Sequence, residues 1–118
     1  MTRSLAAGQP LSLPSVATIA DSLAPPMATP YTFAVCQRFV DRMVLIDDDA
    51  MRRAMGVLFR DLKLAVEPAG AAALAAVLGP LRPQLQGGQR IGIVVCGANI
   101  DLATFFRHAT ATGLIGPP

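Results

Sequence analysis

Charged residues are scarce in this 118-residue sequence: they make up 15% of it, and the formal net charge is only +2. No basic cluster is interleaved with aromatic residues, so we expect no nucleic-acid partner. The two cysteines lack metal-ligand spacing, which excludes a zinc or redox-pair site and favours reduced thiols. The single histidine, His108, has no nucleophile or ligand cluster near it. We therefore expect it at the surface or end of the last helix, and we predict no metal site.

Long hydrophobic runs are also missing. The longest, residues 69–81, is too short to span a bilayer and contains Gly79 and Pro80. Prolines and a glutamine interrupt the first twenty residues, which excludes the apolar core of a signal peptide. No membrane association is predicted, and a cytoplasmic location is the default. Yet 53% of the residues are hydrophobic, an excess that is typical of surface meant to contact another domain or subunit.

The positions of the prolines and glycines divide the chain into three predicted parts. Residues 1–30 hold five of the ten prolines and read as an extended segment with one helical turn near residues 16–23. Residues 31–112 read as one α/β unit, and residues 113–118 as a loose tail. Within the α/β unit the patterns predict helices at 31–41, 47–62, 68–78 and 101–109, strands at 43–46 and 91–95, and a turn at 86–89.

Acidic residues open the second of these helices. Three consecutive aspartates at residues 47–49 suit the positive end of a helix dipole and can cap its free amides, which favours a cap over a metal site. A stripe at helical spacing follows and predicts the buried face: Met51, Met55, Leu58, Phe59 and Leu62.

The most informative stretch is residues 90–101, Arg-Ile-Gly-Ile-Val-Val-Cys-Gly-Ala-Asn-Ile-Asp. Its β-branched run predicts a strand covered on both faces, as in a parallel sheet. Ligands of such sheets bind beyond the carboxyl ends of the strands, where Cys96, Gly97 and Asn99 would lie. The residues alone leave alternatives open, because Cys96 can be a small buried apolar residue and Asn99 a helix cap.

Three segments carry a resemblance to a known family. Cys-Gly-Ala-Asn-Ile-Asp at residues 96–101, Thr-Ile-Ala-Asp-Ser-Leu at 18–23 and Lys-Leu-Ala-Val-Glu-Pro-Ala-Gly-Ala-Ala-Ala at 63–73 occur in the family's order and spacing. Together they resemble the pyridoxal-phosphate-dependent threonine/serine dehydratases and their serine racemase relatives. The resemblance covers about residues 3–108 and corresponds to the C-terminal part of the enzyme. It implies an α/β fold: part of the large domain of the tryptophan synthase β-like fold (fold type II), with a small, mainly parallel sheet flanked by helices.

The resemblance also implies site residues. Cys96 would hydrogen-bond the pyridine nitrogen of the cofactor, with Gly97, Asn99 and Glu67 also near the ring, and Ser22 would lie in the substrate-side wall. Ser22 stands where the family commonly has glycine, which bears on substrate preference. For Glu67 the residues alone also allow a helix cap or an ion pair, because a buried, unpaired carboxylate is costly.

No catalytic residue is assigned. The only lysine, Lys63, matches the family's Lys-Leu-x-x-Glu-Pro segment and not its Schiff-base lysine. That lysine and the glycine-rich phosphate loop lie upstream of anything in this chain. We therefore expect a C-terminal fragment or degenerate version of a dehydratase of small amino acids, inactive alone and missing its N-terminal catalytic portion. The alternative is a non-catalytic interaction protein, acting as a homo-oligomer or as partner of a separate lysine-bearing chain.

Overall fold

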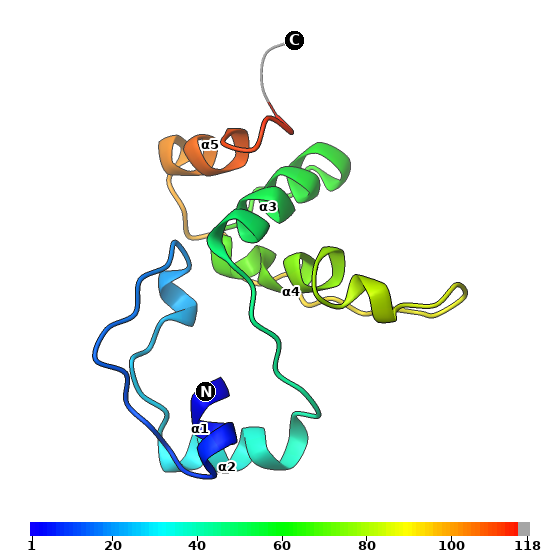
Figure 1. Cartoon of the computed structure of the whole chain (residues 1–118). Helices are drawn as coiled ribbons and strands as arrows, with labels where there is room; N and C mark the ends of the chain where they lie inside the picture. The colour runs from blue at the N-terminus through cyan, green and yellow to red at the C-terminus, as the bar shows by residue number, and fades with distance from the viewer. Residues whose placement is uncertain (116–118) are drawn as a thin grey trace. The chain divides into compact units, whose positions relative to one another are not determined.

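The computed structural model describes residues 1–115, which form two compact units that divide between Val44 and Leu45. Figure 1 shows their helices, and each unit is described by itself below. Residues 116–118, part of the tail predicted at 113–118, lie outside the described residues. No helix among residues 1–115 has both the length and the apolar character that crossing a bilayer requires.

The first unit begins with a short helix that the sequence patterns did not predict. Helix α1, Thr2–Ala7, ends at Gly8, whose φ of 69° gives a left-handed C-cap. The backbone N–H of Leu11 donates to the buried hydroxyl of Ser4 at 3.1 Å, and an isolated antiparallel bridge joins Ser12 to Met27. The predicted helical turn appears as a 3-10 turn, η1, Asp21–Leu23.

Helix α2, Pro30–Phe39, confirms the helix predicted at residues 31–41. It begins with a capping box, in which the Thr29 side chain accepts from the Thr32 backbone and the Thr32 side chain accepts from the Thr29 backbone, each at 3.2 Å. Pro30 occupies the first turn, where its missing N–H costs nothing. Phe33 is the buried residue of this helix.

The second unit is built on helix α3, Asp48–Leu62. It packs against helix α4, Pro68–Leu78, and against helix α5, Leu102–Thr110, so that α3 lies between them (Figure 1). Small side chains let α3 and α4 approach closely. The buried core of the second unit consists of Met51, Ala54, Met55, Leu58, Val66, Ala71, Ala75, Ala76, Phe105 and Ala109.

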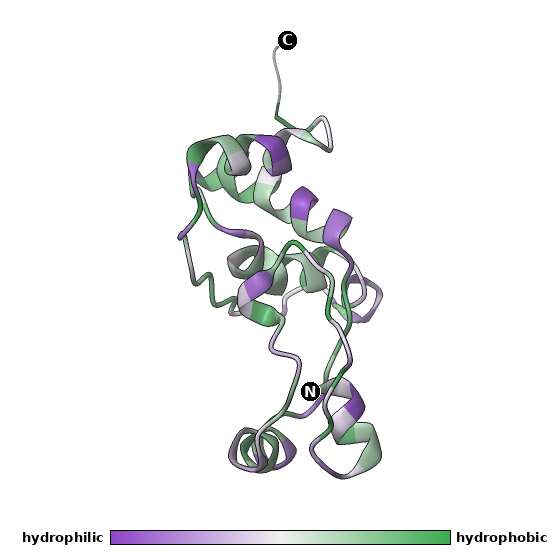
Figure 2. Ribbon diagram, turned by 90° about the vertical axis from the view of Figure 1, so that its left-hand side faces the viewer, coloured by the Kyte–Doolittle hydropathy of each residue, from purple (hydrophilic) through white to green (hydrophobic). Residues whose placement is uncertain are grey.

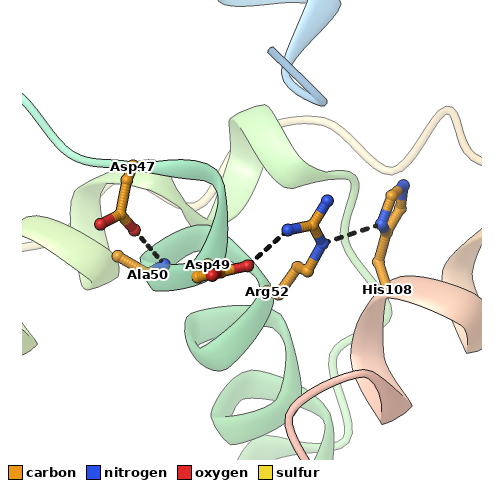
Figure 3. Close-up of polar contacts among 5 residues, drawn as sticks. All are labelled: Asp47, Asp49, Ala50, Arg52 and His108. Carbon is orange, nitrogen blue, oxygen red and sulfur yellow. Dashed lines mark hydrogen bonds and ion pairs between the residues drawn. The ribbon is translucent and has the colours of Figure 1, made fainter.

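The start and buried face of α3 follow the sequence pattern with one exception. Asp47 is the N-cap, and its carboxylate accepts from the Ala50 N–H at 2.7 Å, which confirms the acidic cap (Figure 3). Within residues 1–115 no group of three or more histidine, cysteine or acidic side chains could hold a metal ion. The predicted stripe holds through Leu58, and Phe59 meets the Phe105 ring edge-on at a centroid distance of 5.3 Å. Leu62 is 62% exposed, because α3 ends there and the chain turns away.

The predicted strands at residues 43–46 and 91–95 are wrong for this chain: among residues 1–115 the only β-pairing is the Ser12–Met27 bridge. An extended segment becomes a strand only when neighbouring chain satisfies its backbone groups, and no described residue pairs with residues 91–95. Their apolar side chains are open as well, with Val94 76% exposed. In Figure 2, stretches of chain outside the helices carry the green of hydrophobic residues. The turn at residues 86–89 forms as predicted, after a second 3-10 turn, η2, Arg82–Gln84.

His108 lies in the last turn of α5, which confirms the expected position at the end of the last helix, but it is only 9% exposed and therefore not at the surface. It packs toward α3, where the Arg52 Nε–H donates to its Nδ1 at 3.4 Å and Arg52 in turn pairs with Asp49 at 2.5 Å (Figure 3). Burial lowers the pKa of His108 below 6.5, and the positive charges of Arg52 and Arg107 lower it further, against a weaker opposing effect of Asp48. In the Arg52 contact the Nδ1 of His108 is the acceptor.

This arrangement predicts a loss of stability in mild acid. Because the folded pKa of His108 is lower than the unfolded one, the unfolded chain binds the proton first, and the free energy of unfolding decreases as the pH falls below about 6.5. Urea unfolding measured between about pH 7 and pH 5 should show this slope, and His108→Gln should flatten it because glutamine does not titrate. Equal slopes in both proteins would contradict the assignment.

Candidate functional site

The residues before α4 meet the loop that follows the extended segment 91–95. Glu67 occupies the N-cap position of α4, and its backbone N–H donates to the carbonyl of Gly97 at 3.3 Å. Gly70, in the first turn of α4, lies against the same loop. A Cβ at Gly70 would overlap the carbonyl of Cys96 and lie 2.7 Å from that of Gly97. The loop therefore sits on the helix at a separation that only glycine permits.

Glycine is also required at position 97. Its φ of 88° lies in the left-handed region, and a Cβ there would come within 2.8 Å of the Glu67 side-chain carboxyl carbon. The Glu67 side chain therefore lies on the side of Gly97 toward which a Cβ would project. Ala98, which follows, has no left-handed backbone, and its carbonyl accepts from the Ile100 N–H at 2.9 Å.

Two basic residues near Glu67 in the sequence, Arg60 and Lys63, have contacts at the end of α3. Arg60 forms two bonds to the Asp61 carboxylate, at 2.6 and 2.9 Å, and this pairing lowers the pKa of Asp61. The Lys63 ammonium donates to the Arg60 carbonyl at 2.6 Å, beside a left-handed C-cap at Lys63 itself. Glu67 thus meets Gly97 on the loop side, at the start of α4.

Cys96 ends the extended segment, with a free thiol on an exposed residue. Asn99 is exposed as well and is not the cap of α5, so the cap reading of this residue is wrong. Asp101 takes that role, because its carboxylate accepts from the Thr104 N–H at 2.9 Å, a bond that lowers the pKa of Asp101. Aspartate two positions nearer the helix places its oxygen in reach of the free amides.

Three of the predicted site residues are therefore brought together: Glu67, Cys96 and Gly97. Ser22 belongs to the first unit, in η1, where its backbone N–H donates to the Asp21 carboxylate at 2.8 Å. Gly70 was not singled out from the sequence. A lone glycine inside an alanine-rich helix is the available signal, since it costs helix stability and points to a close backbone approach.

The local chemistry suits a flat heteroaromatic ligand. An exposed thiol can hydrogen-bond a ring nitrogen, and the neighbouring Gly97 offers backbone without a side chain. Beside it, Ile91, Val94 and Val95 present apolar side chains at 47%, 76% and 37% exposure. No described residue hydrogen-bonds the backbone of residues 91–95.

Comparison with known proteins identifies the family of this chain. Residues 1–97 match the family described as "Pyridoxal-phosphate dependent enzyme". Phenylserine dehydratase of Ralstonia pickettii is 48% identical over 108 residues, which cover 92% of this chain and 33% of that protein. Serine racemase of Oryza sativa subsp. indica is 39% identical over 108 residues, covering 89% of this chain and 32% of that protein. The chain thus spans about a third of the length of these curated relatives.

Solved structures show the same fold. The processed form of threonine deaminase isoform 2 from Solanum lycopersicum superposes with a TM-score of 0.86 at 30% identity, covering 98% of this chain and 33% of that one. Maize serine racemase gives a TM-score of 0.77 at 39% identity, covering 89% and 34%. The predicted fold is confirmed as part of the fold type II domain, present here as a small, mostly helical piece. The chain belongs to the family of pyridoxal-phosphate-dependent enzymes.

Proposed function

We propose that this chain forms the pyridine-side wall of the cofactor pocket in a threonine/serine dehydratase-type enzyme. One observation supports this most directly: the exposed Cys96 and the left-handed Gly97 are held on the first turn of α4 through Gly70 and Glu67. A loop seated on backbone contacts keeps its thiol in one place, and a preorganised hydrogen-bonding group needs that rigidity.

Each residue of the wall has a separate role in the proposal. The Cys96 thiol hydrogen-bonds the ring nitrogen and, unlike a carboxylate, leaves that nitrogen essentially unprotonated. Pyridoxal phosphate, when bound, would supply an electron sink for the substrate's α-carbon, and the Cys96 contact would keep that sink weak, which favours loss of a β-hydroxyl. Gly97 lets the ring approach the backbone, with Glu67 behind it, and Asn99 lies next along the loop. Ser22 contributes to the substrate side.

In this proposal the remaining functions come from other polypeptide. Lys63, the only lysine, is engaged with the Arg60 carbonyl at the end of α3 and is not proposed to hold the cofactor. We propose that a segment corresponding to the other two-thirds of the relatives' length supplies the cofactor-binding lysine and the phosphate site. The complete enzyme would take a small hydroxy amino acid, remove its α-proton and β-hydroxyl, and release a 2-oxo acid and ammonia in the cytoplasm. This chain alone is proposed to be inactive.

A chimera tests the proposal. The corresponding third of Ralstonia phenylserine dehydratase is replaced by this chain, which is 48% identical to it over 108 residues. We expect the chimera to bind pyridoxal phosphate and release oxo acid from phenylserine, threonine or serine. The isolated chain with added pyridoxal phosphate and threonine should release none, since neither a cofactor-binding lysine nor a phosphate loop is assigned to it.

The exposed, unpaired residues 91–95 favour a second candidate, a non-catalytic protein that binds another chain through this face. A folded chimera that binds no cofactor would reject the cofactor wall and leave this candidate. Lysine-dependent turnover by the isolated chain would reject both the proposed inactivity and the second candidate.

A further inference from the structure

A cavity in the second unit lies away from the proposed cofactor wall. Its volume is about 240 Å³, below the roughly 300–1,000 Å³ of drug-sized pockets, so only a small ligand fits. It opens where α3, the C-terminal end of α4, η2 and the segment after α5 come together. The lining residues are Ala50, Arg53, Val57, Ala75, Leu78, Gly79, Arg82 and Leu114.

The lining carries positive charge and no acidic residue. The arginines on either side of Arg53 along α3 are neutralised, because Arg52 pairs with Asp49 and Arg60 with Asp61. Neither Arg53 nor Arg82 has a side-chain hydrogen bond or ion pair with any of residues 1–115. Two arginines line this one cavity without a carboxylate, and guanidinium groups are suited to binding an oxyanion.

The rest of the lining is apolar or lacks a side chain. Ala75 is fully within the core, while Val57 and Leu114 are partly buried and Leu78 is 39% exposed. An inorganic anion would gain nothing from these side chains, whereas a short aliphatic chain would remove them from water. We propose that this cavity binds a small organic anion, with its head group held by Arg53 and Arg82 and its aliphatic part against Val57, Ala75 and Leu114.

The test is a titration of the 118-residue chain with hexanoate, its neutral analogue hexanamide and inorganic phosphate, followed by backbone amide NMR shifts. We expect saturable shifts with hexanoate around Val57 and Ala75, and weaker binding of both other probes. Arg53→Gln and Arg82→Gln should each weaken hexanoate binding about five-fold, and the double variant about twenty-fold. Arg90→Gln, an exposed arginine outside the cavity, is the matched control and should change nothing.

Several results would overturn the proposal. These are the absence of saturable hexanoate shifts, equal affinity for hexanamide, equal affinity for phosphate, or unchanged binding in the double variant. Far-UV circular dichroism confirms that each variant retains its helices. If the isolated chain is not monodisperse, the same titration is run on the chimera. The cavity does not include Cys96 or Gly97, so its failure leaves the proposed function standing, and the reverse also holds.

Discussion

Replacing Gly70 by alanine is expected to lower the free energy of unfolding by about 2 kcal/mol. The added methyl group meets backbone atoms, the carbonyls of Cys96 and Gly97, and not the end of a flexible side chain. Accommodating an added group in a packed site costs up to about 3 kcal/mol, and we take this upper value because the clash is with backbone. Alanine gains about 1 kcal/mol of helix propensity, so the steric cost prevails. In the chimera, the same substitution should displace the 96–97 loop and weaken cofactor binding.

Urea unfolding of the Gly70→Ala variant measures this effect, with Gly92→Ala as the control. Gly92 has no atom within 4 Å of a built Cβ and no left-handed backbone, so its stability should change by no more than about 0.5 kcal/mol. Gly97→Ala should fall between them, because there the clash is with the movable Glu67 side chain and the main cost is a left-handed φ. An unchanged or raised stability of Gly70→Ala would show that the loop does not rest on α4.

The helices of this chain were predictable from sequence because their signals are local. Asp47 caps α3, Pro68 opens α4 and Gly79 ends it, and each of these residues acts on its own turn of backbone. The short α1 was missed because the prolines that follow it make the whole segment read as extended. Asn99 and Asp101 are both residue types that cap helices well, and which of them is the cap depends on the residue at which α5 begins.

The strands and the contacts of the site could not be predicted in the same way. Residues 91–95 have the composition of a buried strand, but strand formation depends on pairing with segments far away in sequence. The apolar pattern of residues 91–95 is typical of a strand buried in a sheet, but within residues 1–115 Ile91, Val94 and Val95 are exposed. The contact of Gly70 with the Cys96–Gly97 loop joins residues 26 and 27 positions apart, a separation that no local pattern reports.

The Cys96 thiol should become protected when the pocket is filled. It is exposed in this chain, so iodoacetamide should reach it freely. If it hydrogen-bonds the ring nitrogen, bound pyridoxal phosphate will cover it. Cys36, a partly buried free thiol on α2 in the other unit, is not proposed to touch the cofactor and provides an internal control within the same molecule.

The decisive measurement is the rate of alkylation of each cysteine in the chimera, with and without pyridoxal phosphate, read by peptide mass spectrometry. We predict that the cofactor slows modification of Cys96 by about ten-fold or more and leaves Cys36 unchanged. Bound cofactor together with an unchanged rate at Cys96 would contradict the assignment of this loop to the cofactor pocket.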